Sequence, residues 1–331
     1  MSHKINDSER LPLTLTPKQY KRGSNDIIRL NSKVNIEVSA KEIIDFINNP
    51  KNAETIEKQG IPTRKFYIPI NKEKLVASGL ITEAEAELTG DRISIQIPES
   101  KGYIYKHELL LLDLLATNDW ERPICFTSPT IINEFLPLEK HFHLIGTVYQ
   151  LLPYEAEITH DAYRDNGVRI DTVYHFFMNK YLSGDLEKPE VNIDCESMSA
   201  TRFPQMHLMV LANVLQKTGD TARTIQIADR YCELFPLKRF PPFNYYIPVM
   251  IADSYLTVGE REKGEKMLRE LFETKKEEVE YLTSQKQMKN NWERPIKSAL
   301  SDIYLIGQIA QSHQLSELLS EAHGVITQFY L

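Results

Sequence analysis

The chain has 331 residues, of which 42% are hydrophobic and 26% are charged, a composition typical of a globular protein with room for two ordinary cores. Its 39 basic and 46 acidic residues give a formal net charge of −7, which argues against nucleic acid as a partner because phosphate binding needs a basic surface. No apolar run reaches the length of a membrane span, and the first residues lack the apolar core of a secretory signal.

Short strands and helices are predicted to alternate in the first part of the chain. The region 11–38 is rich in β-branched residues and interrupted by proline, which indicates extended segments and turns. Ser39 and Glu42 then match a capping box, in which each side chain accepts a hydrogen bond at the start of a helix. This pair predicts a helix over 40–49 whose three isoleucines give it one apolar face.

A second group of elements follows. Alternation of apolar and polar residues predicts strands over 65–70 and 92–98, and Asn71 begins a short helix between them. The leucine-rich stretch 105–118 predicts a helix buried on several sides, and a strand over 123–127 comes after it. The order strand, helix, strand predicts an α/β layer.

From about residue 170 the strand signals fade and the period of a helix dominates. The segment 203–236 predicts one helical hairpin, in which Ala212, Gly219 and Pro236 stand at the spacing of a tetratricopeptide repeat. Ile225, Ala228 and Cys232 are expected to face back towards the first helix of this hairpin. At two further repeat positions Thr224 and Tyr231 replace the usual alanine.

A second hairpin is predicted around Ala252, Gly259 and Gly264, and a weaker pair of helices over about 295–328. The fold class expected from these elements is α+β, with an α/β domain over 1–153. A degenerate, tetratricopeptide-like helical array is expected over 154–331.

One candidate site surrounds Trp120 at the end of the leucine-rich helix. Asp119, Glu121 and Arg122 flank this ring, and a carboxylate pair beside an arginine is a combination used in acid–base chemistry. The same residues also suit a helix terminus followed by a turn, because Asn118 favours a helix cap there. Both interpretations remain open from the sequence.

A second candidate site is the aromatic and proline-rich stretch 239–248, which contains Tyr245 and Tyr246. Tyrosines supply a large contact area to a bound polypeptide, so if the array recruits one, Tyr245, Tyr246 or nearby aromatic side chains are expected to be exposed on its concave side. The alternative is a connecting loop that packs on its own neighbours.

Metal and disulfide chemistry have little support. His141 and His143 form an H-x-H pair, but no third ligand stands at a useful spacing, so an exposed or lightly packed pair is expected. Cys125, Cys195 and Cys232 are odd in number and widely spaced, which favours small buried thiols. No metal and no cofactor are therefore expected.

Several segments, in order along nearly the whole chain, resemble those of large bacterial multi-pass membrane proteins related to animal protein O-mannosyltransferases of the IPT-domain type. The most specific is NDWERPI at 118–124, within ELLLLDLLATNDWERPICFTSP. Others are FYIPINKEKLVASGLI, GTVYQLLP, IDTVYHFFMNKYLSGD and the hairpin segment that begins RFPQMHLMVLANVLQ.

The resemblance implies that membrane helices upstream hold the glycosyl-transfer site and that this chain matches only the soluble C-terminal region. It further implies a place on the periplasmic side of the inner membrane, with contact to the membrane only through the upstream part. No catalytic residue is carried over to any position here.

Three functions follow as hypotheses. The first is a non-catalytic accessory region of a membrane glycosyltransferase that holds an acceptor polypeptide or a partner protein. The second is a free-standing helical-repeat scaffold for protein interaction with no role in glycan chemistry. The third, an independent hydrolase using Asp119 or Glu121, requires a well-formed pocket around these carboxylates.

Overall fold

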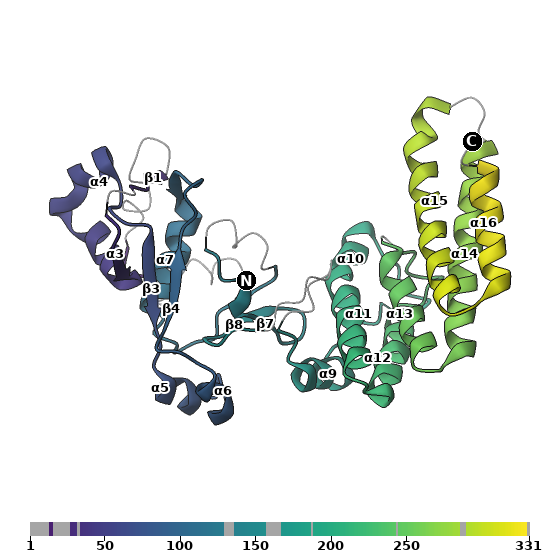
Figure 1. Ribbon diagram of the computed structural model, residues 1–331, viewed down its shortest axis with the longest axis horizontal. Coiled ribbons are helices and arrows are strands. Elements are labelled where there is room, and N and C mark those ends of the chain that lie inside the picture. Colours follow the sequence, from purple (N-terminus) through teal and green to yellow (C-terminus); the bar gives the residue numbers. More distant parts are fainter. Residues whose placement is uncertain are drawn as a thin grey trace. The chain divides into compact units, whose positions relative to one another are not determined.

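The computed structural model describes residues 13–15, 27–31, 34–128, 136–156, 167–186, 188–242, 244–284 and 289–329 (Figure 1). The chain forms two compact units, one of residues Met1–Leu144 with Val148–Thr159 and the other of Ile145–Thr147 with His160–Leu331. Small sheets with helices build the first unit, and helices build the second, so the predicted α+β class is confirmed. In the described part of the chain, no helix combines the length and the apolar character needed to cross a membrane.

The first unit contains short strands and mostly short helices. In chain order they are β1 Ile27–Arg29, β2 Glu37–Ser39, α3 Ala40–Asn48, the 3-10 turn Pro50–Asn52, α4 Ala53–Gln59, β3 Lys65–Pro69, α5 Lys72–Ala77, α6 Glu83–Glu87, β4 Arg92–Gln96, β5 Tyr103–Tyr105, α7 Lys106–Thr117, β6 Cys125–Phe126, the 3-10 turn Glu139–His141, β7 Phe142–Leu144 and β8 Tyr149–Leu151.

The second unit is built from helices that pair in sequence. They are α9 Ile170–Asn179, α10 Cys195–Ala200, α11 Arg202–Lys217, α12 Thr221–Leu234, α13 Tyr246–Thr257, α14 Arg261–Ser284, α15 Lys289–Ser312 and α16 Ser316–Phe329.

The capping box that starts α3 is present as predicted. The Ser39 hydroxyl accepts a hydrogen bond from the Glu42 backbone N–H, and the Glu42 carboxylate accepts one from the Ser39 backbone N–H at 2.6 Å. These bonds satisfy two amide groups that no carbonyl within the helix can reach. Ile43, Ile44 and Ile47 are buried, so the predicted apolar face of α3 is confirmed as well.

A three-stranded sheet in the order β2-β3-β4 holds much of the first core. β2 and β3 run parallel, joined through α3 and α4, whereas β3 and β4 are antiparallel with Phe66 opposite Ile95 and Ile68 opposite Ile93. These four side chains are buried, which confirms the alternation predicted for both strands.

The two strands predicted on either side of a helix over 92–127 do not belong to one sheet. β4 pairs with β3, the additional strand β5 pairs with β1, and β6 pairs with β8, so the strands on either side of α7 belong to different sheets. β6 is also only two residues long, Cys125–Phe126, and finds its partner in the hairpin of β7 and β8 that follows it in the chain. Strand pairing depends on distant residues, which local order does not reveal.

Helix α7 is buried along one side and partly exposed along another. Leu109, Leu112 and Leu115 are buried, while Leu110 is 40% exposed, so the expected burial on several sides is only partly correct. The polar Asp113 is completely buried on the same side as these leucines. Its carboxylate accepts hydrogen bonds from the backbone N–H groups of Thr14 and Leu15 and from the Thr14 hydroxyl, which attaches this segment to the helix.

The first predicted hairpin is formed by α11 and α12, with Gly219 at φ +77° in the turn. Its inner face differs from the prediction at two of the three expected positions: Ala228 is buried, but Ile225 is only half-buried and Cys232 is exposed, while the neighbouring Tyr231 is buried. The side chains of α12 that point inwards are Thr224, Ile227, Ala228 and Tyr231. Adjacent residues of a helix are about 100° apart around its axis, so a buried Tyr231 turns Cys232 outwards.

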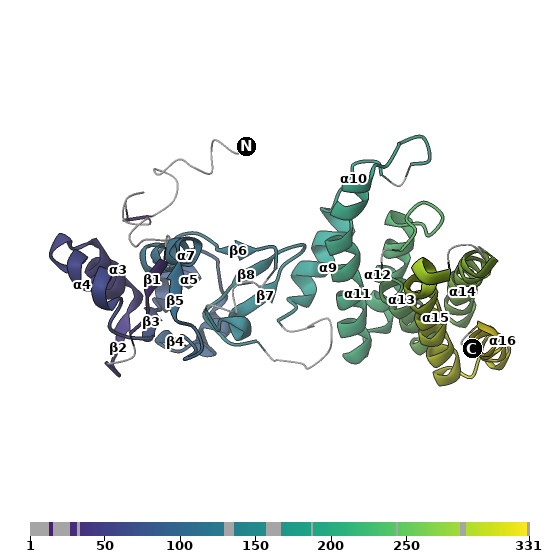
Figure 2. The same cartoon turned by 90° about the horizontal axis from the view of Figure 1, so that it is seen from above.

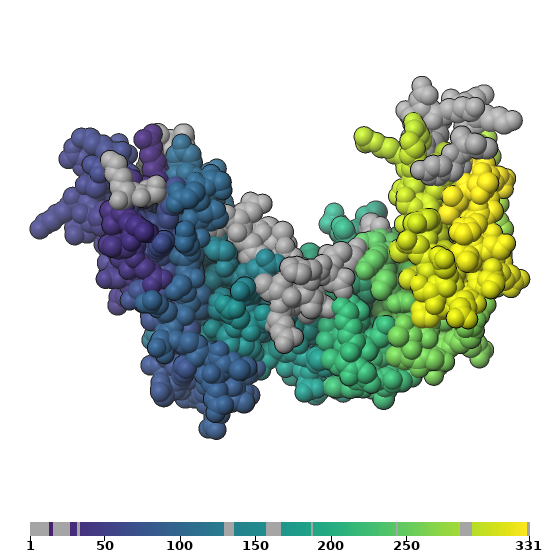
Figure 3. Space-filling view, viewed as in Figure 1, coloured from purple at the N-terminus to yellow at the C-terminus, as the bar shows by residue number. Residues whose placement is uncertain are grey.

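The second and third hairpins are formed by α13 with α14 and by α15 with α16. Figures 1 and 2 show α11, α12 and α13 side by side, and Figure 3 shows the yellow helix α16 lying along α15. Gly264 allows α14 to approach α13 closely, because a Cβ atom at this position would lie 2.6 Å from Leu256 Cγ. The predicted turn glycine Gly259 has φ +92°.

His207, in α11, should make the stability of the second unit depend on pH. Burial lowers the pKa of His207 to about 4 from an ordinary value of 6.5, so the folded state keeps the ring neutral. The unfolded chain takes up a proton first as the pH falls, and stability present above pH 6.5 is lost towards pH 4.

Between pH 7 and pH 5 this loss is expected to be about 2 kcal/mol. The measurement is urea unfolding of the natural chain and of His207→Leu at both pH values. The variant should lack this part of the pH dependence, and equal slopes for both proteins would contradict the assignment.

Candidate ligand-binding pocket

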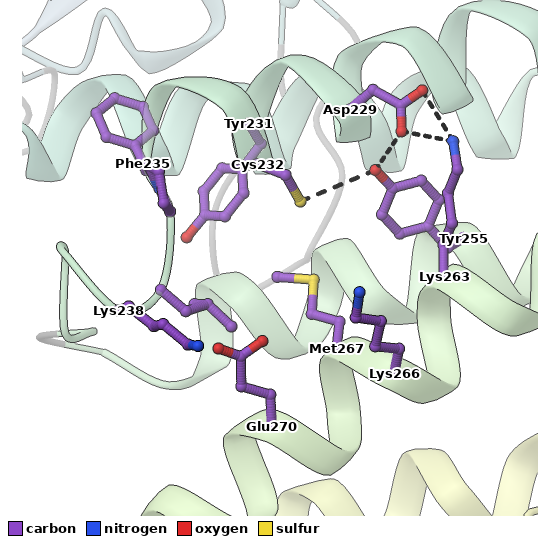
Figure 4. Close-up of a pocket in the computed structure, with 12 residues that line it drawn as sticks. Asp229, Tyr231, Cys232, Phe235, Lys238, Tyr255, Lys263, Lys266, Met267 and Glu270 are labelled. Atoms are coloured by element: carbon purple, nitrogen blue, oxygen red, sulfur yellow. Dashed lines mark hydrogen bonds and ion pairs between the residues drawn. The ribbon is translucent and has the colours of Figure 1, made fainter. Parts of the chain in front are cut away.

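A pocket of about 400 Å³ lies within the second unit, between helices α12, α13 and α14 and the segment 235–238 (Figure 4). Helices α12 and α14 are the second helices of neighbouring hairpins, and α13 contributes Tyr255 between them. The lining residues are Asp229, Tyr231, Cys232, Phe235, Pro236, Leu237, Lys238, Tyr255, Lys263, Lys266, Met267 and Glu270.

A polar network on one side of the pocket fixes three of these residues. Lys263 Nζ lies 2.7 Å from Asp229 Oδ1 and 3.0 Å from Oδ2, and the Tyr255 hydroxyl donates a hydrogen bond of 2.7 Å to Asp229 Oδ1. The hydrogen bond with Asp229 raises the pKa of Lys263, and burial raises the pKa of Tyr255. Lys263 therefore stays charged, Tyr255 stays neutral, and the charge of the Asp229 carboxylate is neutralised by the Lys263 ammonium group.

Cys232 lies next to this network but is not prepared for nucleophilic attack. Its Sγ atom is 3.9 Å from the Tyr255 hydroxyl oxygen. The residue keeps an exposed surface because the pocket is open, while the surrounding protein atoms displace part of the thiol's water and raise its pKa. A thiol with a raised pKa is a weak nucleophile near neutral pH, since the thiolate is the reactive form.

The cysteines as a group correct one expectation from the sequence. Cys125, Cys195 and Cys232 are all exposed and form no disulfide, whereas buried thiols were expected. Cys125 lies in the short strand β6 and Cys195 opens the short helix α10, so neither stands on the apolar face of a long helix.

The other side of the pocket combines apolar walls with charged side chains. Phe235 and Met267 are almost fully buried, and together with Leu237 they form the apolar part of the lining. Figure 4 shows the ammonium groups of Lys238 and Lys266 on either side of Met267. Such a surface suits a ligand with an apolar group and a nearby negative charge, whereas covalent chemistry would need an activated group.

The predicted site around Trp120 forms a turn at the end of α7. Trp120 is 6% exposed, and its indole N–H donates a hydrogen bond of 2.8 Å to the Pro69 carbonyl oxygen. Asp119 and Trp120 both have positive φ values, 45° and 59°, and the Asn118 side chain donates to the Arg122 carbonyl oxygen at 2.9 Å. These contacts explain the residues as a chain reversal that anchors α7 beside β3.

The charged members of this group lie at the surface. Lys74 Nζ is 2.6 Å from Asp119 Oδ2 and 3.2 Å from Glu121 Oε1, and the hydrogen bond with Asp119 raises the pKa of Lys74. The side chains of Asp119 and Glu121 are 63% and 69% exposed, and Arg122 is exposed too. These residues are consecutive in the chain, and the sequence did not show that Lys74, from α5, joins them.

The expected exposure of Tyr245 is wrong. Tyr245 is only 5% exposed, its ring lies 4.0 Å from Lys275 Nζ of α14, and burial raises its pKa. Tyr246, the first residue of α13, is half-buried. The ring of Tyr245 is covered because the connection leading into α13 packs against the next hairpin, so this residue cannot supply an open contact surface.

The histidine pair is bound to the protein backbone. His141 Nδ1 lies 3.2 Å from the Leu152 carbonyl oxygen and His143 Nε2 lies 3.2 Å from that of Tyr154. His143 is buried, contrary to the expected light packing, and its ring packs 4.4 Å from that of Tyr154. In the described ranges, no group of three metal-binding side chains comes together.

The sequence did not predict the pocket, although single signals were present. In the sequence Tyr231 stands at an irregular repeat position, and Lys263 and Lys266 follow a turn glycine in a helix rich in charge. Their convergence with Tyr255 and Phe235 depends on how one hairpin packs on the next.

The chain matches the model of a known protein family. The family model for TMEM260-associated domain 2 matches residues 1–172, which is more than half of the 331 residues. No curated protein and no solved structure matches. The matched range ends within α9, so the three hairpins and the pocket lie beyond it. The match shows that the predicted resemblance to a known family holds at the level of a TMEM260-associated domain, and the chain belongs to the family of TMEM260-associated domain 2.

Proposed function

We propose that the chain is a non-catalytic accessory region of a membrane glycosyltransferase similar to protein O-mannosyltransferases, and that its helical array holds an acceptor polypeptide or a partner protein. The family match supports a role beside a TMEM260-like protein. The array supports binding, because stacked helical hairpins offer extended surfaces to other chains. In this proposal the array faces the extracytoplasmic side, and the reaction centre lies in membrane helices upstream.

The observation that carries the proposal is the pocket between the first two hairpins. Its volume of about 400 Å³ falls in the range of ~300–1,000 Å³ typical of ligand sites. Its Cys232 thiol and Tyr255 phenol both have raised pKa values, so neither is activated for attack. The Lys263 ammonium group neutralises the charge of Asp229, so these polar groups favour binding of a ligand over its chemical conversion.

The proposal predicts binding without sugar transfer. The purified 331-residue chain is incubated with polyprenyl-phosphate mannose and candidate acceptor domains, and hexose addition is followed by mass spectrometry. Binding of an acceptor domain without an increase in mass is expected, because the transferred group would need a positioned acid or base within ~3 Å.

Two variants distinguish the proposed accessory role from an enzymatic role. Asp119→Ala and Glu121→Ala remove the carboxylates that pair with Lys74, and neither change should affect acceptor binding. Sugar transfer or hydrolysis by the natural chain that either variant abolishes would favour the enzyme hypothesis over the accessory role.

A free-standing interaction scaffold without a role in glycan chemistry is the second candidate. One observation favours it, namely that the pocket lies outside the residues matched by the family model. The upstream gene sequence separates the two candidates, because several apolar segments of ~20 residues there would support the membrane glycosyltransferase.

A further inference from the structure

We propose that the pocket binds a short acidic polypeptide segment, whose apolar side chain enters between Phe235 and Met267 and whose carboxylate pairs with Lys238 and Lys266. This inference rests on the proposed role of the array in holding polypeptide, and it adds the chemistry of the segment that is held.

The charge of the pocket opposes that of the chain as a whole. The chain carries a formal charge of −7, yet three lysines and only two carboxylates line the pocket. One lysine and one carboxylate neutralise each other, since Lys263 forms an ion pair of 2.7 Å with Asp229. Lys238, Lys266 and Glu270 remain, so the part of the pocket open to a ligand has a net positive charge.

Lys238 and Lys266 are available to a ligand. Among the described residues, neither side chain takes part in a hydrogen bond or an ion pair, and both are exposed. The other lysines of α14 already form ion pairs: Lys263 pairs with Asp229, Lys275 with Glu278 and Asp302, and Lys276 with Glu273. An incoming carboxylate would gain two partners without displacing an internal ion pair.

The apolar wall between Lys238 and Lys266 is the second feature that a ligand of this pocket must match. Phe235 is 2% exposed and Met267 is 6% exposed, so both are fixed by packing, and the unbranched thioether of Met267 adapts readily to different side chains. Burial of one large apolar side chain stabilises a complex more than an exposed ion pair does. The apolar residue is therefore the anchor, and the acidic residue provides selectivity.

A polypeptide is the occupant that these features favour. The pocket lies between the second helices of two stacked hairpins, and stacked hairpins offer extended surfaces to other chains. The Glu270 carboxylate would repel a densely charged anion such as a nucleotide phosphate. A basic segment, in turn, would meet two lysines.

The test uses the full chain and three fluorescein-labelled peptides of equal length. The first peptide carries phenylalanine between aspartate and glutamate residues, the second has serine in place of phenylalanine, and the third has lysines in place of the acids. We expect the first to bind at least about tenfold more tightly than either of the others. Equal affinity for the acidic and the basic peptide would overturn the inference.

Variants then locate the site. The double variant Lys238→Glu with Lys266→Glu should weaken binding of the acidic peptide by about tenfold or more, because both charges that attract it are reversed. Lys276→Glu is the matched control, since it makes the same change on α14 but at a lysine that pairs with Glu273 outside the pocket. An equal effect of the control and the double variant would contradict a local site.

Alkylation of cysteine provides a direct measure of occupancy. Cys232 lines the pocket, whereas Cys125 and Cys195 are exposed elsewhere, so the three thiols compare one site with two internal controls. The acidic peptide should slow the reaction of Cys232 with iodoacetamide and leave the other two rates unchanged. Peptide binding that protects none of the three would place the site elsewhere and overturn the inference.

Two results distinguish this inference from the proposed function. If acceptor domains bind and the acidic peptide fails to compete with them, the inference fails and the proposed function stands. If the peptide protects Cys232 while no acceptor domain binds, the pocket chemistry stands and the accessory role fails.

Discussion

Replacement of Asp113 by alanine is expected to lower the free energy of unfolding by about 3 kcal/mol, one of the largest effects of a single substitution in this chain. The carboxylate is completely buried and accepts hydrogen bonds of 2.9 Å and 3.0 Å from the backbone N–H groups of Thr14 and Leu15. Its removal leaves these donors without an acceptor in a region where Leu15 is 5% exposed. Chemical denaturation measures the loss.

Two comparisons test the cause of that loss. Asp113→Asn keeps one acceptor oxygen and should cost less than the alanine variant, whereas Asp45→Ala, at an exposed position of α3, should change stability by less than about 0.5 kcal/mol. Hydrogen exchange at the Leu15 amide should become much faster in Asp113→Ala. An unchanged exchange rate there would show that the carboxylate does not hold this segment.

The second large effect is expected at Gly264, where α14 approaches α13. An added Cβ atom would lie 2.6 Å from Leu256 Cγ and 2.9 Å from the Ala252 carbonyl oxygen. Because the carbonyl belongs to a packed helix, the backbones must separate, and such overpacking costs about 1–3 kcal/mol. We expect Gly264→Ala to destabilise the protein by about 2 kcal/mol, measured by urea unfolding, even though alanine favours a helix.

Gly324 offers the same chemical change without the contact. It lies in α16, and a Cβ atom added there would have no heavy atom within 4 Å. Gly324→Ala should therefore stabilise the protein by about 0.5–1 kcal/mol through its better helix propensity. The two alanine variants are expected to differ in sign, and a stabilising Gly264→Ala would show that the helices can move apart at little cost.

Local interactions explain which parts of the fold could be predicted. The capping box of Ser39 and Glu42 needs only residues three apart, and the alternation over 92–98 reports one buried face of a strand. The turn glycines Gly219 and Gly259 are likewise fixed by the left-handed backbone that each adopts. Each of these predictions was confirmed because its cause lies within a few residues of the chain.

The exposure of the candidate site residues could not be predicted from local patterns. Trp120 stands beside two carboxylates in the sequence, but its ring is buried through a contact with Pro69, which is distant in the chain. Tyr245 lies in a stretch that resembles a surface loop, yet Lys275 of the following helix covers its ring. Exposure depends on neighbours brought by folding, and residue type alone does not supply them.

By itself, the sequence determined the α+β class, the position of the hairpins and the resemblance to a known family, since these follow from periodicity, turn residues and local segments. The tertiary structure alone decided the pairing of β5 with β1 and of β6 with β8. It also created the pocket, whose lining comes from three helices and the segment after α12. Both depend on contacts between residues far apart in the chain, where packing selects one arrangement among many that satisfy the same local preferences.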